Sequence, residues 1–331
     1  RIAVLSQNRR EYLELELAAA AIGAVTACLN WRLADKEQAH CISLVAPKLA
    51  VVDPRLAENF RRVSMVEELL LGPDYEAAIK SGRDRRPEAR STPEDGLVIL
   101  YTSGTTGLPK GAVISHRAMI ARAMVFASDM GIRADDAFLA WAPMFHMIST
   151  DHALATLMRG GHVVVIDGFQ AAEICAAVAE YRIGWLVLIP GMIEVFSEAF
   201  RAAGKPPKGV TCCGAMADLV PPHQIGEVTA LLDAPFVNSF GATETGVPPA
   251  SRDLISPGQI PESLSKRQNA FCEIKLVHPE DNEVADGEPG ELAMRGPTLF
   301  SGYWNAPEVN DKDFRGGWFH MGDVFRRLPD G

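Results

Sequence analysis

The chain has 331 residues, of which 47% are hydrophobic and 22% are charged, and its formal net charge at pH 7 is -10. This length allows a large buried core, built as two or three ordinary domains or as one elaborate α/β domain. The acidic balance offers no basic surface for a phosphate backbone or an anionic membrane, so we expect no nucleic-acid partner.

Cysteine spacing and apolar runs bear on the compartment. The six cysteines include no C-x-x-C pair and none at metal-ligand spacing with a histidine, which predicts buried thiols in a reducing compartment. The longest apolar run, residues 17–29, is shorter than the roughly 20 residues that cross a bilayer, and no signal peptide precedes it. We therefore predict a cytoplasmic protein without a transmembrane segment. Because the sequence starts at Arg1 and stops at Gly331 in mid-pattern, the natural polypeptide is expected to be longer.

Short runs of branched residues alternate along the chain with longer segments of helical period. This alternation is typical of parallel sheets wrapped by helices. Strands are predicted at residues 2–6, 25–29 and 49–53, with helices at 10–23 and 35–45 between them. Further strands are predicted at residues 97–101, 138–141, 162–166, 185–189, 209–213 and 236–240.

Two stretches have a different texture. Residues 72–93 are dense in charge, glycine and proline, which predicts a surface excursion. After Gly246, prolines interrupt the alternation, and short strands are predicted at 272–277 and 290–295. We therefore expect α/β subdomains over residues 1–246 and a β-rich subdomain over residues 247–331.

The most informative segment is residues 101–111, Tyr-Thr-Ser-Gly-Thr-Thr-Gly-Leu-Pro-Lys-Gly, which follows a predicted strand and precedes a helix capped by Ser115. Glycines let backbone N–H groups face phosphate oxygens, hydroxyls add donors or a magnesium ligand, and Lys110 adds a positive charge. The Walker P-loop pattern fails because Gly111, not Ser or Thr, follows Lys110. The string predicts a triphosphate site. The alternative is a flexible connection without a ligand.

The same string resembles the phosphate-loop signature of the acyl-adenylate-forming superfamily, which contains AMP-forming acyl-CoA synthetases, peptide-synthetase adenylation domains and firefly luciferase. Other segments support the resemblance because they follow the family's order at plausible spacing. They are Pro143-Met-Phe-His146, Asn238-Ser-Phe-Gly-Ala-Thr-Glu-Thr245, Glu291-Leu-Ala-Met-Arg-Gly-Pro297, Gly302-Tyr-Trp and Gly317-Trp-Phe-His-Met-Gly-Asp323.

The resemblance implies a role for each motif. Glu244 would hold magnesium together with Thr102, Thr243 would contact the α-phosphate, Phe240 would flank the adenine, and Asp323 would bind the ribose hydroxyls. The nucleotide-binding set that it implies is Thr102, Ser103, Gly104, Thr105, Thr106, Gly107, Lys110, Gly214, Ala215, Met216, Asn238, Phe240, Gly241, Thr243 and Asp323. The implied acyl-site residues are His146, Ile189, Pro190, Gly214 and Gly241, and the implied catalytic residues are Lys110, Thr102, Glu244 and His146.

The implied fold is the large N-terminal domain of an adenylate-forming enzyme: mixed, mostly parallel sheets wrapped by helices, plus a distorted β-barrel-like subdomain that ends near a hinge. Residues 1–246 would bind nucleotide and acyl group, and the small C-terminal domain would be absent from this chain. The implied reaction joins a carboxylic acid to AMP from ATP, with Mg²⁺, and then transfers the acyl group to coenzyme A. A homodimer is a further expectation from the resemblance.

The substrate is expected to lack an α-amino group. Amino-acid-activating relatives carry an aspartate at the position of His146, because burying an unpaired substrate ammonium would be costly. The resemblance implies that residues 187–193, Ala215 and Met216 line the acyl pocket, and their apolar character favours a fatty or aryl acid. Met192 and Ile193, at helical spacing, could equally be core. Two positions depart from the family pattern: Cys213 replaces a common glycine, and residues 265–269 replace a Gly-x-Pro turn. The alternatives are a module that serves a carrier protein, a luciferase-like oxygenase and a non-catalytic nucleotide-binding relative.

Overall fold

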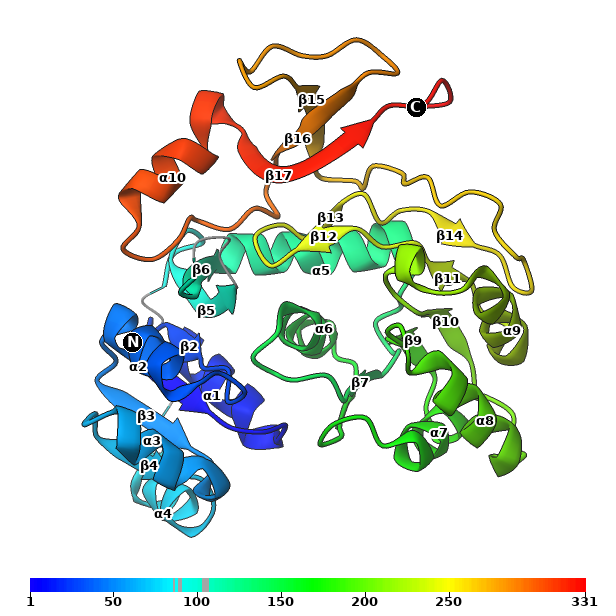
Figure 1. Ribbon diagram of the computed structural model, residues 1–331. Helices are drawn as coiled ribbons and strands as arrows, with labels where there is room; N and C mark the ends of the chain where they lie inside the picture. Colours follow the sequence, from blue (N-terminus) through cyan, green and yellow to red (C-terminus); the bar gives the residue numbers. More distant parts are fainter. Residues whose placement is uncertain (86, 89–90, 103–106) are drawn as a thin grey trace.

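The computed structural model describes residues 1–85, 87–88, 91–102 and 107–331. Two α/β units lie side by side, and antiparallel strands lie over them together with the last helix (Figure 1). The mixed, mostly parallel sheets and their covering helices confirm the predicted fold class. The division near residue 246 stays a prediction.

The first unit is a six-stranded sheet in the order β4-β3-β1-β2-β5-β6. Its first five strands run parallel, whereas β6 is antiparallel to β5. The strands are β1 (Ile2–Leu5), β2 (Thr26–Cys28), β3 (Leu49–Val52), β4 (Glu68–Leu70), β5 (Gly96–Thr102) and β6 (Lys110–Ser115). The helices are α1 (Arg10–Ala21), α2 (Asp35–Val45), α3 (Ala57–Val63) and α4 (Pro73–Ser81), with a 3-10 turn, η1, at Pro54–Leu56.

The second unit holds the remaining parallel strands. Strand β9 (Ile183–Leu186) pairs in parallel with β10 (Val210–Cys213), which continues to β11 (Phe236–Val237) and the antiparallel β14 (Leu254–Ile255). A separate parallel pair is β7 (Phe138–Ala140) with β8 (Val163–Val165). The helices are α5 (His116–Met130), α6 (Met147–Met158), α7 (Ala171–Glu180), α8 (Ile193–Ala203) and α9 (Pro222–Leu232), with η2 at Ala217–Leu219. A largely continuous apolar core joins this unit to the first.

The later residues form short strands, as predicted, and these strands pair antiparallel. Strands β15 (Glu273–Val277), β16 (Pro289–Arg295) and β17 (Phe319–Arg326) make an open three-stranded sheet. A short ribbon of β12 (Gly241–Ala242) and β13 (Gly246–Pro249) precedes it. Helix α10 (Pro307–Asp313) and η3 (Arg315–Gly317) connect β16 to β17.

Strand β6 was not predicted. The sequence analysis placed the segment 101–111 before a helix capped by Ser115, and that cap is present, because the Ser115 hydroxyl accepts from Ala118 N at 3.2 Å. However, residues 110–115 form a strand that pairs antiparallel with β5 before α5 begins. The described ends of the segment therefore belong to two paired strands, with Thr102 opposite Lys110.

The predicted surface excursion at residues 72–93 also needs a correction. Most of its described residues are exposed, but Pro73–Ser81 forms α4, and Tyr75 packs with Val51 and Leu71 against the first sheet. All six cysteines are free thiols and five of them are buried, while Cys272 is half-buried. Within the described residues, no helix combines the length and apolar character that a membrane span requires.

Candidate active site

An apolar cavity of about 320 Å³ lies between the start of α6 and the loops that follow β9, β10 and β11. Parallel strands present their carboxyl ends at one edge of a sheet, which is where ligand crevices form in such folds. Six predicted site residues line this cavity, namely His146, Ile189, Ala215, Met216, Phe240 and Gly241, whereas Pro190 and Gly214 do not appear in its described lining. The structure thus brings together residues almost 100 positions apart in the chain.

His146 begins helix α6 and faces this cavity. Its Nδ1 accepts a hydrogen bond from Ile148 N at 3.3 Å, so the proton of the neutral ring lies on Nε2. Desolvation lowers the pKa of His146, which keeps the ring neutral at physiological pH. A neutral side chain at this position offers no counter-charge to a substrate ammonium.

Sequence analysis missed Asn8, which holds the loop before His146 in place. This buried amide donates to the carbonyls of Ala140, Ala142 and Ile166 at 2.8–3.1 Å. It also accepts from Met144 N at 3.0 Å. Its partners lie more than 130 residues away, so no local pattern could indicate this role.

The loop after β10 shows why a glycine is required at position 214. Gly214 has a φ of +72°, and a Cβ there would lie 2.0 Å from the Phe236 ring. Its carbonyl accepts from Trp185 Nε1 at 2.7 Å, and Met216 N donates to the Ser239 hydroxyl at 2.8 Å. Cys213 is fully buried on β10, so its departure from the family pattern faces the core.

Asn238 lies at the end of β11 and is fully buried. Its Nδ2 donates to Ser265 O at 2.8 Å, and its Oδ1 accepts from the Lys266 ammonium. Lys266 also pairs with Asp218 at 2.6 Å. Both ends of the Asn238 amide are therefore engaged by the segment 265–269 that departs from the family pattern, and a nucleotide contact by this side chain stays a prediction.

Phe240, the predicted adenine residue, borders a second, larger cleft of about 1170 Å³, which it and Asp218 share with the first cavity. Val324 and Phe325, which follow the predicted ribose residue Asp323, line the same cleft. Phe240 packs edge-on against Phe325 of β17, with ring centroids 4.6 Å apart. Asp323 is exposed on the same strand, and desolvation raises its pKa. The preceding Gly322 N donates to the Glu291 carboxylate at 3.1 Å, which fixes the backbone beside Asp323.

Lys110 and Thr102 face each other across the β5–β6 hairpin. The Lys110 ammonium lies 3.9 Å from the centroid of the Tyr303 ring and 3.9 Å from the Asp313 carboxylate. The Tyr303 hydroxyl in turn donates to Glu244 Oε1 at 2.7 Å. The predicted phosphate-binding lysine and the predicted magnesium ligand are thus connected through one tyrosine. Ser103, Gly104, Thr105 and Thr106 lie outside the described residues.

The backbone around Thr243 and Glu244 is fixed by Arg122, another residue that sequence analysis missed. Its guanidinium donates to Thr243 O at 3.0 Å, to Thr298 O at 3.0 Å and to Asp151 at 2.9 Å. The side chains of Arg122 and Asp151 are both completely buried. A buried ion pair therefore supports the loop that carries Glu244.

The oxygen ligands available here suit magnesium. Glu244 is only 9% exposed, and one carboxylate oxygen receives the Tyr303 hydrogen bond, which leaves the second for a cation. The described residues contain no group of three or more His, Cys, Asp or Glu side chains able to hold a metal. Because Mg²⁺ is usually held by one or two carboxylates together with substrate phosphates, Glu244 fits an ion that arrives with ATP. A second ligand from the Thr102 hydroxyl stays a prediction.

Comparison with known proteins identifies the family of this site. A model described as "AMP-binding enzyme" matches residues 1–304. The chain belongs to that family. It is similar to the indoleacetate–CoA ligase of Aromatoleum aromaticum, with 29% identity over all of this chain and 67% of the relative. A feruloyl-CoA synthase of an Amycolatopsis species has the same identity over the same shares of the two chains.

A solved structure supports the match. The inhibitor-bound N-terminal domain of FACL13 from Mycobacterium tuberculosis superposes with a TM-score of 0.86 at 25% identity, covering all of this chain and 84% of that one. The chain spans about two thirds of the length of the two curated relatives. Membership confirms the predicted class, an AMP-forming acid–thiol ligase for which ATP, Mg²⁺ and coenzyme A are the cofactors and co-substrate.

Proposed function

We propose that the protein activates a carboxylic acid with ATP to an acyl-adenylate and pyrophosphate, and then transfers the acyl group to coenzyme A. The observation that carries the proposal is the proximity of two kinds of site. An apolar cavity ends at Phe240 and Gly241, and the loop that follows them leads to Glu244, which Tyr303 connects to Lys110. A hydrophobic acid and a triphosphate would therefore meet at residues 240–244.

The chemistry follows from bringing two anions together. The substrate carboxylate is already ionised at neutral pH, so it attacks the α-phosphorus without a general base, and pyrophosphate leaves. The Lys110 ammonium would offset charge on the phosphate oxygens, and the residues at 243–244 would orient the α-phosphate. Bound magnesium would supply further neutralisation of that charge. The neutral His146 would contact the acyl group near the reacting carboxylate.

The acid is proposed to be an aryl or fatty acid without an α-amino group. The cavity is lined mainly by apolar side chains, and the pKa of its histidine is lowered. The Asp218 carboxylate in its lining already pairs with Lys266, so an ammonium would be buried there without a free partner. The names of the two curated relatives, which act on indoleacetate and ferulate, favour an aryl acid. Transfer to a carrier protein instead of coenzyme A is the second candidate, since the thiol acceptor is not specified by these residues.

The test is acid-dependent exchange of labelled pyrophosphate into ATP by the full natural polypeptide. The panel contains short, medium and long fatty acids, arylacetic and cinnamic acids, and the twenty amino acids. We expect exchange with one apolar class and AMP release on adding coenzyme A. Faster exchange with any amino acid would contradict the substrate proposal. No exchange with any acid, in a protein that still binds ATP, would favour a non-catalytic relative.

A further inference from the structure

Tyr303 occupies the centre of the predicted reaction site. It lies in the segment that follows β16, and this segment returns to strand β6: Val113 N donates to Gly302 O at 3.0 Å and Trp304 N donates to Gly111 O at 2.8 Å. At its other end, Phe300 N donates to Glu244 O at 2.8 Å. Residues 300–304 therefore connect the hairpin that carries Lys110 to the loop that carries Glu244.

The side chain of Tyr303 is held firmly in that position. It is 6% exposed, and its ring packs edge-on against Phe300 with centroids 4.8 Å apart. Its backbone N–H and carbonyl both bond the side-chain amide of Asn310, at 2.7 and 2.9 Å. With ring and backbone both fixed, the hydroxyl has one direction in which to donate, toward Glu244.

Tyr303 contacts two side chains of opposite charge, Glu244 and Lys110. The hydroxyl donates to one oxygen of Glu244 at 2.7 Å, which leaves the other carboxylate oxygen for a cation. The ring face receives the Lys110 ammonium at 3.9 Å, a cation–π distance. A phenol ionises only at about pH 10, so the hydroxyl is a donor throughout the physiological pH range.

We propose that Tyr303 is a positioning residue for magnesium-bound ATP, whose hydroxyl orients Glu244 toward the cation while its ring orients Lys110 toward the phosphates. Partners behind a metal ligand typically fix its orientation in this way. The inference rests on the proposed function. It adds that the Gly302-Tyr-Trp motif has a chemical role as well as a structural one.

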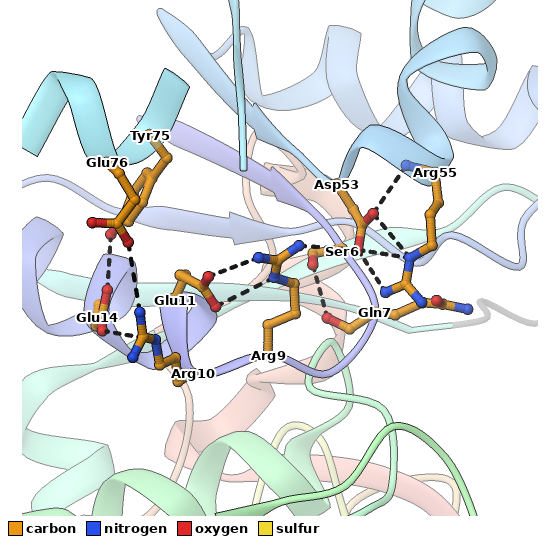
Figure 2. Close-up of polar contacts among 10 residues, drawn as sticks. All are labelled: Ser6, Gln7, Arg9, Arg10, Glu11, Glu14, Asp53, Arg55, Tyr75 and Glu76. Atoms are coloured by element: carbon orange, nitrogen blue, oxygen red, sulfur yellow. Dashed lines mark hydrogen bonds and ion pairs between the residues drawn. The ribbon is translucent and has the colours of Figure 1, made fainter. Parts of the chain in front are cut away.

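The test is the variant Tyr303→Phe in the full natural polypeptide, because it removes the hydroxyl and keeps the ring beside Lys110. We expect ATP affinity in the presence of Mg²⁺, measured by calorimetry, to fall about 10- to 100-fold, as for other residues behind a metal ligand. ATP affinity in EDTA should stay unchanged. The matched control is Tyr75→Phe, which also removes a hydroxyl that bonds a carboxylate, Glu14 at 3.3 Å (Figure 2). Tyr75 lies on α4, which follows β4 at the edge of the first sheet opposite β6.

A double-mutant cycle with Glu244→Gln distinguishes orientation of the Glu244 carboxylate by Tyr303 from a nonspecific disturbance of the site. Because the hydroxyl is proposed to act through the Glu244 carboxylate, Tyr303→Phe should add little to the Mg²⁺ effect of Glu244→Gln. The inference would be overturned if Tyr303→Phe lowered ATP affinity equally with and without Mg²⁺. It would also be overturned if Tyr303→Phe lowered ATP affinity as much in the Glu244→Gln protein as in the wild type. Wild-type protein that forms no adenylate would instead overturn the proposed function. Melting temperatures close to that of Tyr75→Phe establish that the variants fold.

Discussion

Two groups of charged side chains follow strands of the first sheet, and they are arranged in opposite ways. Beyond β3, Asp53 is 1% exposed and is surrounded by cations, with Arg55 at 2.7 Å and Arg9 at 4.0 Å (Figure 2). Beyond β5, Lys110 has its described carboxylate partner, Asp313, only at 3.9 Å. The first group neutralises itself, whereas the second keeps its charge available for a ligand.

The pKa of Asp53 reflects the first arrangement. Burial alone would raise it, but the hydrogen bonds from Arg55 outweigh that effect and lower the pKa. At the other site, Glu244 receives a hydrogen bond from a neutral phenol rather than from a cation. A site that binds an ionic ligand, as proposed for Lys110 and Glu244, needs charge that the protein itself does not fully neutralise. A charged group that only stabilises the fold, such as Asp53, can be fully neutralised by its neighbours.

The largest effect is expected where a buried pair supports the reactive loop. Asp151→Ala leaves the Arg122 guanidinium buried without a counter-charge, so we expect the free energy of unfolding to fall by about 3–5 kcal/mol. Urea denaturation measures the change. The comparison is Asp135→Ala, which breaks an exposed ion pair with Arg133 and should cost far less. Equal decreases in the free energy of unfolding for the two variants would show that burial of the Arg122–Asp151 pair does not increase the cost of breaking it.

Activity should distinguish the two strand ends. Lys110→Met removes a charge that is only loosely paired with Asp313, so we expect the rate of pyrophosphate exchange to fall by about 10²–10³-fold, as when one group that stabilises developing charge is removed. Stability should change little, because the ion pair with Asp313 is long and partly exposed.

The reverse pattern is expected at the first strand end. Asp53→Asn weakens the hydrogen bonds to Arg55, so it should lower the melting temperature and leave the exchange rate unchanged. If Asp53→Asn impairs exchange as strongly as Lys110→Met does, the proposed contrast between the two regions is wrong.

Sequence reasoning succeeded where the signal is local. The Ser115 cap and the helices predicted at 10–23 and 35–45 depend on neighbours within a few residues. It missed β6, because six residues directly after a loop give too short a pattern to separate a strand from the start of a helix.

The supporting contacts of the site could not be predicted from local patterns. Tyr303 and Glu244 are 59 residues apart, Arg122 and Thr243 are 121 apart, and Asn8 reaches across 132 or more. These hydrogen bonds join ordinary residue types, without periodicity or spacing to mark them. A motif can identify the residues that touch a ligand, but the residues that orient them are determined by tertiary structure.

A further effect, visible as a pH dependence, is expected at a third kind of acidic group, one that is buried without a described cation beside it. Glu16 on α1 is completely buried, and its described hydrogen bond comes from the Cys28 thiol at 3.6 Å. Desolvation raises the pKa of Glu16 to about 8. The folded protein therefore keeps this proton at a pH where the unfolded chain, with an ordinary carboxyl pKa of about 4.3, has lost it.

The sign of the pH dependence follows from that difference. Between pH about 4.3 and 8 the folded state binds one proton more than the unfolded state, so the contribution of Glu16 to stability decreases as pH rises and is lost above its folded pKa. Glu16→Gln keeps the shape and cannot ionise, so its free energy of unfolding should fall less than that of the wild type between pH 5 and 9. Urea denaturation of both proteins across this range measures the difference. Parallel curves would mean that Glu16 has an ordinary pKa in the folded protein, and that this third group is compensated as fully as Asp53.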